Sequence, residues 1–236
     1  MAEEDEALAC GADGCATPVS ARGEAVVGAA AAELSVVSDA ICPWCYVGKR
    51  RLEQAFALID GTPRPRVTWR PFELNPQMPK EGIERREYRM RKFGSWERSL
   101  ALDAQLTDVG RSVGIDFRYD LMKRTPNTFD AHRLIWLAGR MGVQDAMVET
   151  LFRGYFSEGR DIGDASVLAD LAAVAGMDRQ QAAAFLKGTD GAAEVSAEVE
   201  VALRAGLSGV PTFVLDGRVL FSGAQPPELI AQALTR

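Results

Sequence analysis

The chain has 236 residues and a formal net charge of −6, which suits one domain with an insertion or one domain with a small partner. No apolar run approaches the length of a membrane span, so we expect no membrane partner. Residues 1–33 contain seven acids and one base, while the 26 acids and 26 bases of the remainder cancel. Because the main body carries no basic excess, we expect no nucleic-acid partner.

Residues 1–33 are rich in Ala, Gly and Glu and show no sustained hydrophobic period, which predicts a mobile leader. They lack a basic start followed by an apolar stretch, so we expect no secretory signal and a cytoplasmic location. Cys10 and Cys15 lie in this segment with four residues between them. Three interpretations remain open: an auxiliary dithiol that exchanges with a second cysteine pair, half of a four-cysteine metal site, or two incidental thiols.

The first regular elements surround that second pair, Cys42 and Cys45. The segment Leu34–Ser38 is short and rich in β-branched residues, which predicts a buried strand. Farther on, apolar residues recur at helical spacing and predict a helix over about residues 44–59, namely Leu52, Ala55, Phe56 and Ile59. The motif Cys42-Pro43-Trp44-Cys45 therefore lies at the junction of a strand and a helix.

A C-x-x-C motif at a helix N-terminus favours redox chemistry. The unpaired N–H groups and the partial positive charge at that end stabilise a thiolate on Cys42. Pro43 fits the first turn, where no N–H is needed, and Cys45 is near enough to resolve a mixed disulfide. The alternatives are half of a zinc site, a structural disulfide, or two unconnected thiols. The only histidine, His132, excludes a histidine-rich site, and we expect no metal.

Later elements complete a sheet around a helical block. A second strand at Val67–Phe72 makes a βαβ unit with parallel strands. Pro71 lacks a ladder donor and should lie at a sheet edge or strand end. The other predicted elements are a helical block over 79–206, a hairpin of Thr212–Leu215 and Arg218–Phe221 joined by Asp216-Gly217, and a helix from Pro226-Pro227.

Removing the helical block leaves a small sheet with helices on both faces, which predicts an α/β fold. We predict three parts: the leader 1–33, a domain formed by 34–78 and 207–236, and an all-helical insertion at 79–206. A basic cluster in the insertion alternates with glutamates, which is typical of a solvated helix face. Its members are Arg85, Arg86, Arg89, Arg91, Lys92 and Arg98.

Four segments resemble the DsbA branch of the thioredoxin-fold oxidoreductases, and the first three resemble its FrnE-like subgroup. They are Cys42-Pro43-Trp44-Cys45-Tyr46-Val47-Gly48-Lys49, Trp69-Arg70-Pro71-Phe72-Glu73-Leu74-Asn75-Pro76, Asn127-Thr128-Phe129-Asp130-Ala131-His132-Arg133-Leu134 and Gly209-Val210-Pro211-Thr212. The resemblance covers roughly residues 34–236. It implies a thioredoxin-like fold, βαβ…ββα, with a large DsbA-like helical insertion.

The resemblance also implies roles for the motif residues. Cys42 would be the attacking thiol and Cys45 the resolving thiol. Val210 and Pro211 would form a cis peptide pair beside them, where a substrate chain could pair with exposed backbone. Trp44 should be exposed, flank the dithiol and contact substrate. It stands where strongly oxidising members have a histidine, so we predict a less oxidising couple.

Three further residues are candidates with alternative interpretations. Asp39 lies three residues before Cys42. It is interpreted either as a general base for Cys45 or as a turn or cap residue. His132 and Phe72 lie in the family-like segments and could contribute to a substrate pocket. The alternative for His132 is a packed or half-exposed helix residue.

These observations predict a thiol–disulfide oxidoreductase, with reductase, oxidase or isomerase activity. Its substrates would be protein or small-molecule disulfides and dithiols. We expect no cofactor beyond the redox-active pair, with glutathione or a thioredoxin-type protein as a possible reductant. The alternatives are a glutathione-dependent enzyme resembling 2-hydroxychromene-2-carboxylate isomerase and a non-catalytic zinc or chaperone-like module. A monomer and a homodimer are both compatible with the sequence.

Overall fold

The computed structural model describes residues 32–61 and 63–235. Its main sheet has the strand order β2-β1-β5-β6. The strands are β1 (Glu33–Ser38), β2 (Arg66–Pro71), β5 (Thr212–Leu215) and β6 (Arg218–Ser222). β1 pairs with β2 in parallel and with β5 antiparallel, and β5 pairs antiparallel with β6. The predicted parallel βαβ unit and the late hairpin are both confirmed.

The strand sequences explain this arrangement. β1 lies inside the sheet, and its Leu34 and Val36 are fully buried. Pro71 is the last residue of the edge strand β2. At such a position the sheet does not need the N–H that proline lacks. Asp216 and Gly217 have φ values of 48° and 79°, and positive φ at both central residues is typical of a tight hairpin turn. Glu33 belongs to β1, so the predicted leader overlaps the first strand by one residue.

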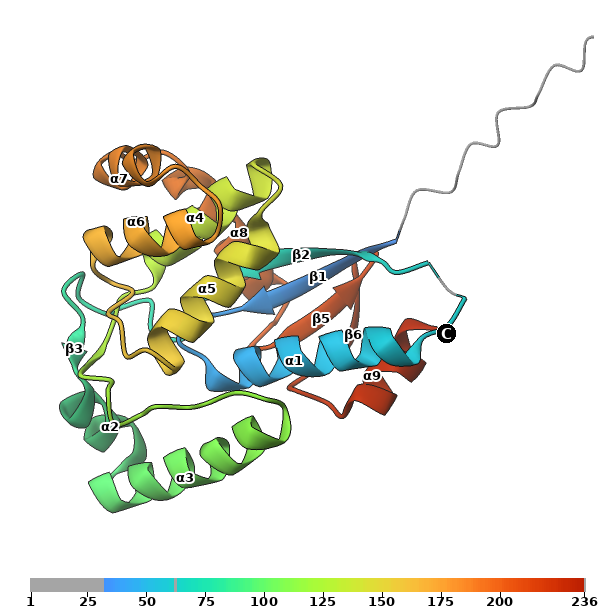
Figure 1. Ribbon diagram of the computed structural model, residues 1–236, viewed down its shortest axis with the longest axis horizontal. Coiled ribbons are helices and arrows are strands. Elements are labelled where there is room, and N and C mark those ends of the chain that lie inside the picture. Colours follow the sequence, from blue (N-terminus) through green and yellow to red (C-terminus); the bar gives the residue numbers. More distant parts are fainter. Residues whose placement is uncertain (1–31, 62, 236) are drawn as a thin grey trace, which may run out of the picture. The chain divides into compact units, whose positions relative to one another are not determined.

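The helix that follows the first strand and the helix that follows the last strand lie against the sheet. α1 (Pro43–Leu58) and α9 (Pro227–Leu234) pack on each other, and Figure 1 shows them side by side beneath the strands. Their apolar residues Leu52, Ala55 and Ile230 are buried. The helix predicted over about 44–59 is therefore present, and it starts directly after Cys42.

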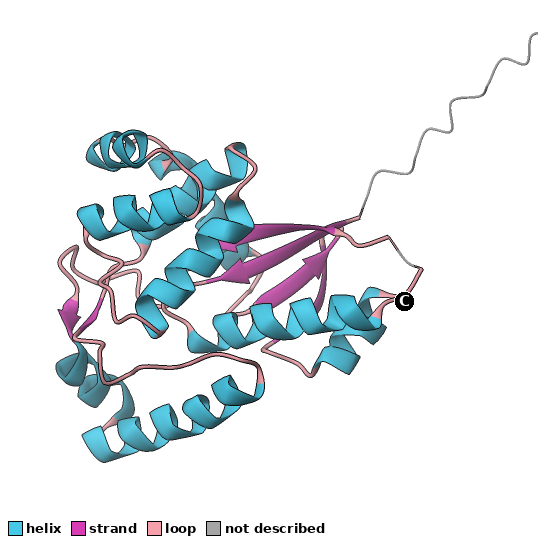
Figure 2. Ribbon diagram, in the orientation of Figure 1, coloured by secondary structure: helices cyan, strands magenta, loops and turns pink. Residues whose placement is uncertain are grey.

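Between β2 and β5 the chain is mainly helical (Figure 2). The helices there are α2 (Arg85–Phe93), α3 (Trp96–Ser112), α4 (Phe129–Arg140), α5 (Gln144–Phe156), α6 (Ala165–Val174), α7 (Arg179–Lys187) and α8 (Ala192–Arg204). The prediction of an all-helical insertion is wrong at one point, because β3 (Ile83–Glu84) and β4 (Arg124–Thr125) form a small antiparallel sheet. Strands of two residues have no periodicity that a sequence could reveal.

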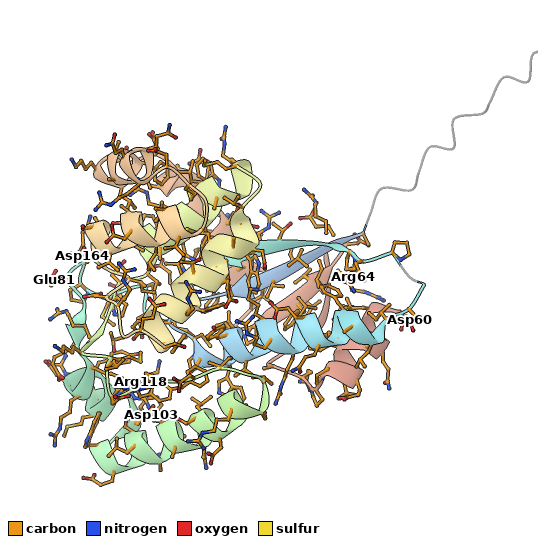
Figure 3. The ribbon with its side chains drawn as sticks, in the orientation of Figure 1. Asp60, Arg64, Glu81, Asp103, Arg118 and Asp164 are labelled. Carbon is orange, nitrogen blue, oxygen red and sulfur yellow. The ribbon has the colours of Figure 1, made fainter. Side chains whose placement is uncertain are left out.

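Side-chain caps fix where several of these helices begin. Asp164 accepts hydrogen bonds from the backbone of Ser166 and Val167, and Asp178 accepts one from Gln181. Figure 3 labels Asp164. Aspartate is among the residue types preferred at this position, because its carboxylate can accept backbone N–H groups of the first turn. None of the described helices is both long and apolar enough to cross a membrane.

Candidate active site

Cys42 is the N-cap residue of α1. Its backbone is extended, with φ −90° and ψ 111°, and its side chain makes no capping hydrogen bond. The Cys42 N–H donates to the carbonyl of Asp39 at 3.0 Å, and Pro43 occupies the start of the helix. The sulfur therefore lies at the positive end of the helix dipole without being used to cap the helix.

Cys45 lies one turn later, and its N–H donates to the Cys42 carbonyl at 3.0 Å. Both are free thiols. Cys45 is fully buried, and burial is the main reason that its pKa is raised well above the ordinary thiol value. The hydrogen bond with Cys42 and the charge of Cys42 raise this pKa further, the hydrogen bond with the Asp39 backbone lowers it, and the charge of Asp39 raises it. Cys45 is therefore a neutral thiol near pH 7.

The Val210–Pro211 peptide bond is cis, which confirms the expectation drawn from the family resemblance. The Cys42 thiol points at the Val210 carbonyl, with Sγ and O 3.6 Å apart. The Thr212 hydroxyl donates to the Gly209 carbonyl at 2.8 Å and fixes the loop on its other side. The loop thus places a backbone carbonyl directly beside the first cysteine.

Gly48 allows α1 to approach this loop. A Cβ atom at position 48 would lie 3.0 Å from Cγ of Pro211 and 3.5 Å from Phe213. The contact with Pro211 would be tighter than most real Cβ contacts, while the contact with Phe213 would be an ordinary one. A larger residue would push the cis-proline loop away from the dithiol, so Gly48 is a site residue that the motif contained but that sequence reasoning did not single out.

Asp39 is fully buried beneath the dithiol. Its Oδ1 accepts from the Ile41 N–H at 3.3 Å, and its Oδ2 accepts from the Leu74 N–H at 2.7 Å. The side chain therefore stabilises the turn before α1 and also connects that turn to the segment after β2. Its charge lies near enough to influence Cys45, while its role as a general base stays a prediction.

His132 and Phe72 are buried, with 2% and 6% of their surfaces exposed. The His132 Nε2–H points at the Phe72 carbonyl at 3.1 Å and lies 3.6 Å from Oδ1 of Asp39. Neither residue lines the cavity beside Cys42; His132 instead lines a separate cavity of about 460 Å³ along β2. The structure places the imidazole against the Phe72 carbonyl and Asp39, and a contribution of His132 and Phe72 to a substrate pocket stays a prediction.

The cavity beside Cys42 has a volume of about 360 Å³. One wall contains Cys42, Trp44 and Val210, and the other comes largely from α2 and α3. Figure 1 shows these two helices on the side where α1 begins. Trp44 is 42% exposed, as expected. The dithiol is therefore flanked by a concave surface that the helical insertion completes.

Part of the basic cluster belongs to this cavity and not to a solvated face. Arg85 is only 5% exposed, and it donates to Oδ2 of Asp103 at 2.7 Å. Arg89 donates to Oδ1 of the same carboxylate at 2.6 Å. Figure 3 labels Asp103, which lies on α3. The solvated-face interpretation is therefore wrong for Arg85 and Arg89, because α3 supplies a buried partner that sequence alternation could not reveal.

The remaining prediction concerns Cys10 and Cys15, and both lie outside the described residues.

Sequence reasoning also missed Tyr119, which lines the cavity from the segment after α3. No motif marks Tyr119, because it reaches the cavity only through the packing of the insertion.

The comparisons with known proteins agree with this geometry. Residues 33–235 match a family model described as a DSBA-like thioredoxin domain. A probable DsbA oxidoreductase from Streptomyces coelicolor is 36% identical, with a TM-score of 0.79 over 86% of this chain and 88% of that chain.

Two more distant structures share the fold. The cytosolic disulfide reductase DsbM from Pseudomonas aeruginosa is 22% identical, with a TM-score of 0.60 over 86% of this chain and 97% of that chain; it also has a structure with GSH. A 2-hydroxychromene-2-carboxylate isomerase is 16% identical, with a TM-score of 0.59 over 81% and 89% of the two chains. The extent of the family match and the identity to the Streptomyces protein show that the chain belongs to the DsbA-like thioredoxin domain family.

Proposed function

We propose that this protein is a thiol–disulfide oxidoreductase in which Cys42 attacks and Cys45 resolves. The observation that carries the proposal is the asymmetry of the pair. Cys42 lies at the helix N-terminus and borders a cavity, whereas Cys45 is fully buried behind it. An outside sulfur can therefore reach Cys42 but not Cys45.

In the reductive direction the Cys42 thiolate attacks one sulfur of a substrate disulfide. An S–S bond to Cys42 forms, the substrate S–S bond breaks, and the other substrate sulfur leaves as a thiolate that takes up a proton. Cys45 then loses its proton and attacks Sγ of Cys42, which releases the second substrate thiol. Two electrons pass from the dithiol to the substrate, and the reverse sequence oxidises a substrate dithiol.

Asp39 would accept the Cys45 proton in the resolving step, because its carboxylate is buried near that thiol. Replacing Asp39 with Asn should change the pH dependence of resolution. An unchanged pH profile would leave Asp39 with only the hydrogen bonds to Ile41 and Leu74 that the structure shows.

An external reductant must restore the dithiol after each reductive cycle. Glutathione and a thioredoxin-type protein are the candidates, and a structure of the distantly related DsbM with GSH supports the first. This direction suits the reducing cytoplasm, where a C-x-x-C pair serves catalysis more often than structure.

Insulin reduction driven by dithiothreitol tests the proposal. The wild-type protein should accelerate it, Cys42→Ser should abolish the acceleration, and Cys45→Ser, reduced and then freed of dithiothreitol, should react once and accumulate a mixed disulfide. If Cys42→Ser matched the wild-type protein, the proposed chemistry would be wrong.

The isomerase-like alternative is favoured by one observation, the cavity that the insertion builds beside Cys42. It requires glutathione-dependent turnover of a small molecule without a dithiol cycle. Turnover that survives in Cys45→Ser with added glutathione would support this alternative. A strict need for both sulfurs would exclude it.

A further inference from the structure

The cavity beside Cys42 is lined mainly by apolar and aromatic side chains, among them Phe93, Leu102, Leu106, Met122 and Phe156. Its volume of about 360 Å³ lies within the range of small-molecule sites. No aspartate or glutamate belongs to its described lining, whereas Arg85, Arg89 and Lys92 do. The surface is therefore apolar with an excess of positive charge.

The charges of the two arginines are not balanced among the described residues. Arg85 and Arg89 share the single carboxylate of Asp103, and no other described acid lies within ion-pair distance of either guanidinium. Burial is the main cause that lowers the pKa of Arg89, and the charge of Arg85 contributes. An uncompensated buried cation destabilises a fold unless an anion pairs with it. This cluster has room for one more negative charge.

Lys92 adds a third cation at the same wall. Its Nζ donates to the Tyr88 hydroxyl at 2.7 Å, and it forms no ion pair among the described residues. The neighbouring Arg91 is different, because it pairs with Glu87 on the exposed side of α2 and does not line the cavity. Two adjacent cations of one helix thus differ in whether they face the site.

Tyr119 provides a neutral donor. Its hydroxyl is buried yet has no hydrogen-bond partner among the described groups. Burial raises the pKa of Tyr119 far above its ordinary value, so the hydroxyl keeps its proton. A buried hydroxyl without a partner is costly, and a ligand in the cavity that Tyr119 lines could supply the acceptor.

We propose that this cavity binds a small organic anion with an apolar or aromatic body, held by Lys92, the Arg85–Arg89 pair and the Tyr119 hydroxyl. The inference rests on the proposed function in one respect: the bound molecule carries the thiol or disulfide that exchanges with Cys42. The exchange itself is the balanced two-electron sequence given above. An acidic character and a compact apolar body thus define the substrate class.

Two chromogenic disulfides test charge selection. Dithiobis(nitrobenzoate) is aromatic and carries a carboxylate on each ring, whereas dithiodipyridine is aromatic and uncharged. Rate constants for their reaction with the reduced protein are measured by stopped flow. Lys92→Gln should slow the anionic probe about tenfold, the value of one charge-assisted hydrogen bond, and change the neutral probe by less than about twofold.

Arg91→Gln is the matched control, because it removes the same charge from the same helix outside the cavity. It should leave both rates within about twofold of the wild-type values. Equal slowing of the anionic probe by Lys92→Gln and Arg91→Gln would show long-range attraction and overturn the site. Slowing of both probes by Lys92→Gln would overturn charge selection. If, with Cys10 and Cys15 replaced by Ser in both proteins, Cys42→Ser reacted with dithiodipyridine as fast as the protein that keeps Cys42, the proposed function would fail instead.

A sulfur-free anion tests the cavity independently of redox chemistry. Naphthoate binding is measured by calorimetry with the wild-type protein and with Tyr119→Phe. The variant should fold with unchanged or higher stability, since the lost hydroxyl has no protein partner, and its Kd should rise about tenfold. Naphthoate binding no tighter than acetate binding, or an unchanged Kd in Tyr119→Phe, would contradict the proposed ligand class.

Discussion

Cys42 and Cys45 lie on the same turn of α1 but have different surroundings. The first is the N-cap residue and borders a cavity, and the second is fully buried beside Asp39. The sequence motif already predicts different roles for the two thiols, and the packing adds to that difference by placing the first beside a cavity and burying the second fully. The raised pKa of Cys45 should make the proposed resolving step depend on pH.

This asymmetry predicts the pH dependence of resolution. The attacking form of Cys45 is the thiolate, and a raised pKa means that its fraction grows about tenfold per pH unit until the pH reaches that pKa. We expect the rate constant for resolving a preformed mixed disulfide to rise through pH 9 without levelling off. Quenched-flow trapping with a small disulfide measures it, and a plateau near pH 8.5, the ordinary thiol pKa, would contradict the burial argument.

The sequence predicted the residues whose roles follow from local geometry. Cys42, Cys45 and Pro43 owe their positions to a strand–helix junction, and the resemblance added the cis bond before Pro211. Arg85, Asp103 and Tyr119 were not predictable in the same way. They come from three segments that meet only in the folded insertion, and no periodicity in the chain relates them.

At the scale of elements, α2 and α3 are joined by the shared carboxylate of Asp103. The Ser99 hydroxyl also accepts from Nε of Arg89 at 2.7 Å. These polar contacts help to fix the wall of the cavity opposite Cys42. The stability of this wall should therefore depend on one acid.

Replacing Asp103 with Asn should lower the free energy of unfolding by about 3–5 kcal/mol, because two largely buried guanidinium groups lose their counter-charge. Asp108→Asn is the matched control, since Asp108 lies on the same helix in an exposed pair with Arg111. It should change stability by less than about 1 kcal/mol. Urea unfolding of both variants measures the difference, and similar values would mean that the Asp103 cluster is not needed for folding.

Helices and strands with a clear hydrophobic period could be predicted from the sequence. The short strands β3 and β4, which exist only because they pair with each other, could not. Asp164 and Asp178 begin α6 and α7 because their carboxylates accept backbone N–H groups of the first turn. The N-cap residue of α4 is Thr128, and the side chain of Asn127 before it accepts from the Phe129 N–H at 2.9 Å. Cap chemistry can be recognised in a sequence, but its exact register depends on tertiary contacts.

At the scale of the whole described unit, α5 closes the outer edge of the sheet. The Gln144 amide accepts from the Trp69 N–H at 2.9 Å and donates to the Trp69 carbonyl at 3.1 Å. Its side chain thus replaces a neighbouring strand at this point of β2. Asp145 accepts from the Trp69 indole at 3.0 Å. Two consecutive residues of the insertion therefore cover groups that an edge strand would leave unpaired.

A second connection joins α1 to α5. Lys49 is only 4% exposed and lies within 3.3 Å of carboxylate oxygens of Glu53, Asp145 and Glu149. Burial alone would lower the pKa of Lys49, but the hydrogen bond with Glu53 and the Asp145 and Glu149 charges raise it overall. The lysine therefore stays charged and ties the helix that carries the dithiol to the insertion.

These two connections bear on the division into 34–78 with 207–236 and an insertion at 79–206, which we retain as a proposal about chain organisation. An insertion held by the backbone of Trp69 and by Lys49 should not unfold alone. We expect urea unfolding to be a single transition in which helix content and the environment of Trp69 change together. Circular dichroism measures the helix content. Fluorescence measures the environment of Trp69 in a variant whose other tryptophans, Trp44, Trp96 and Trp136, are replaced by Phe.

Gln144→Ala sharpens this test, because it leaves the N–H and carbonyl of Trp69 without their partner. Both midpoints should fall together by an amount equivalent to about 1–3 kcal/mol, the cost of an unsatisfied buried polar group. If the fluorescence midpoint fell while the helix signal stayed at its original midpoint, the insertion would be an independently folding domain. The wall that it contributes beside Cys42 would then be free to move relative to the dithiol, and the cavity would exist only while the two parts are docked.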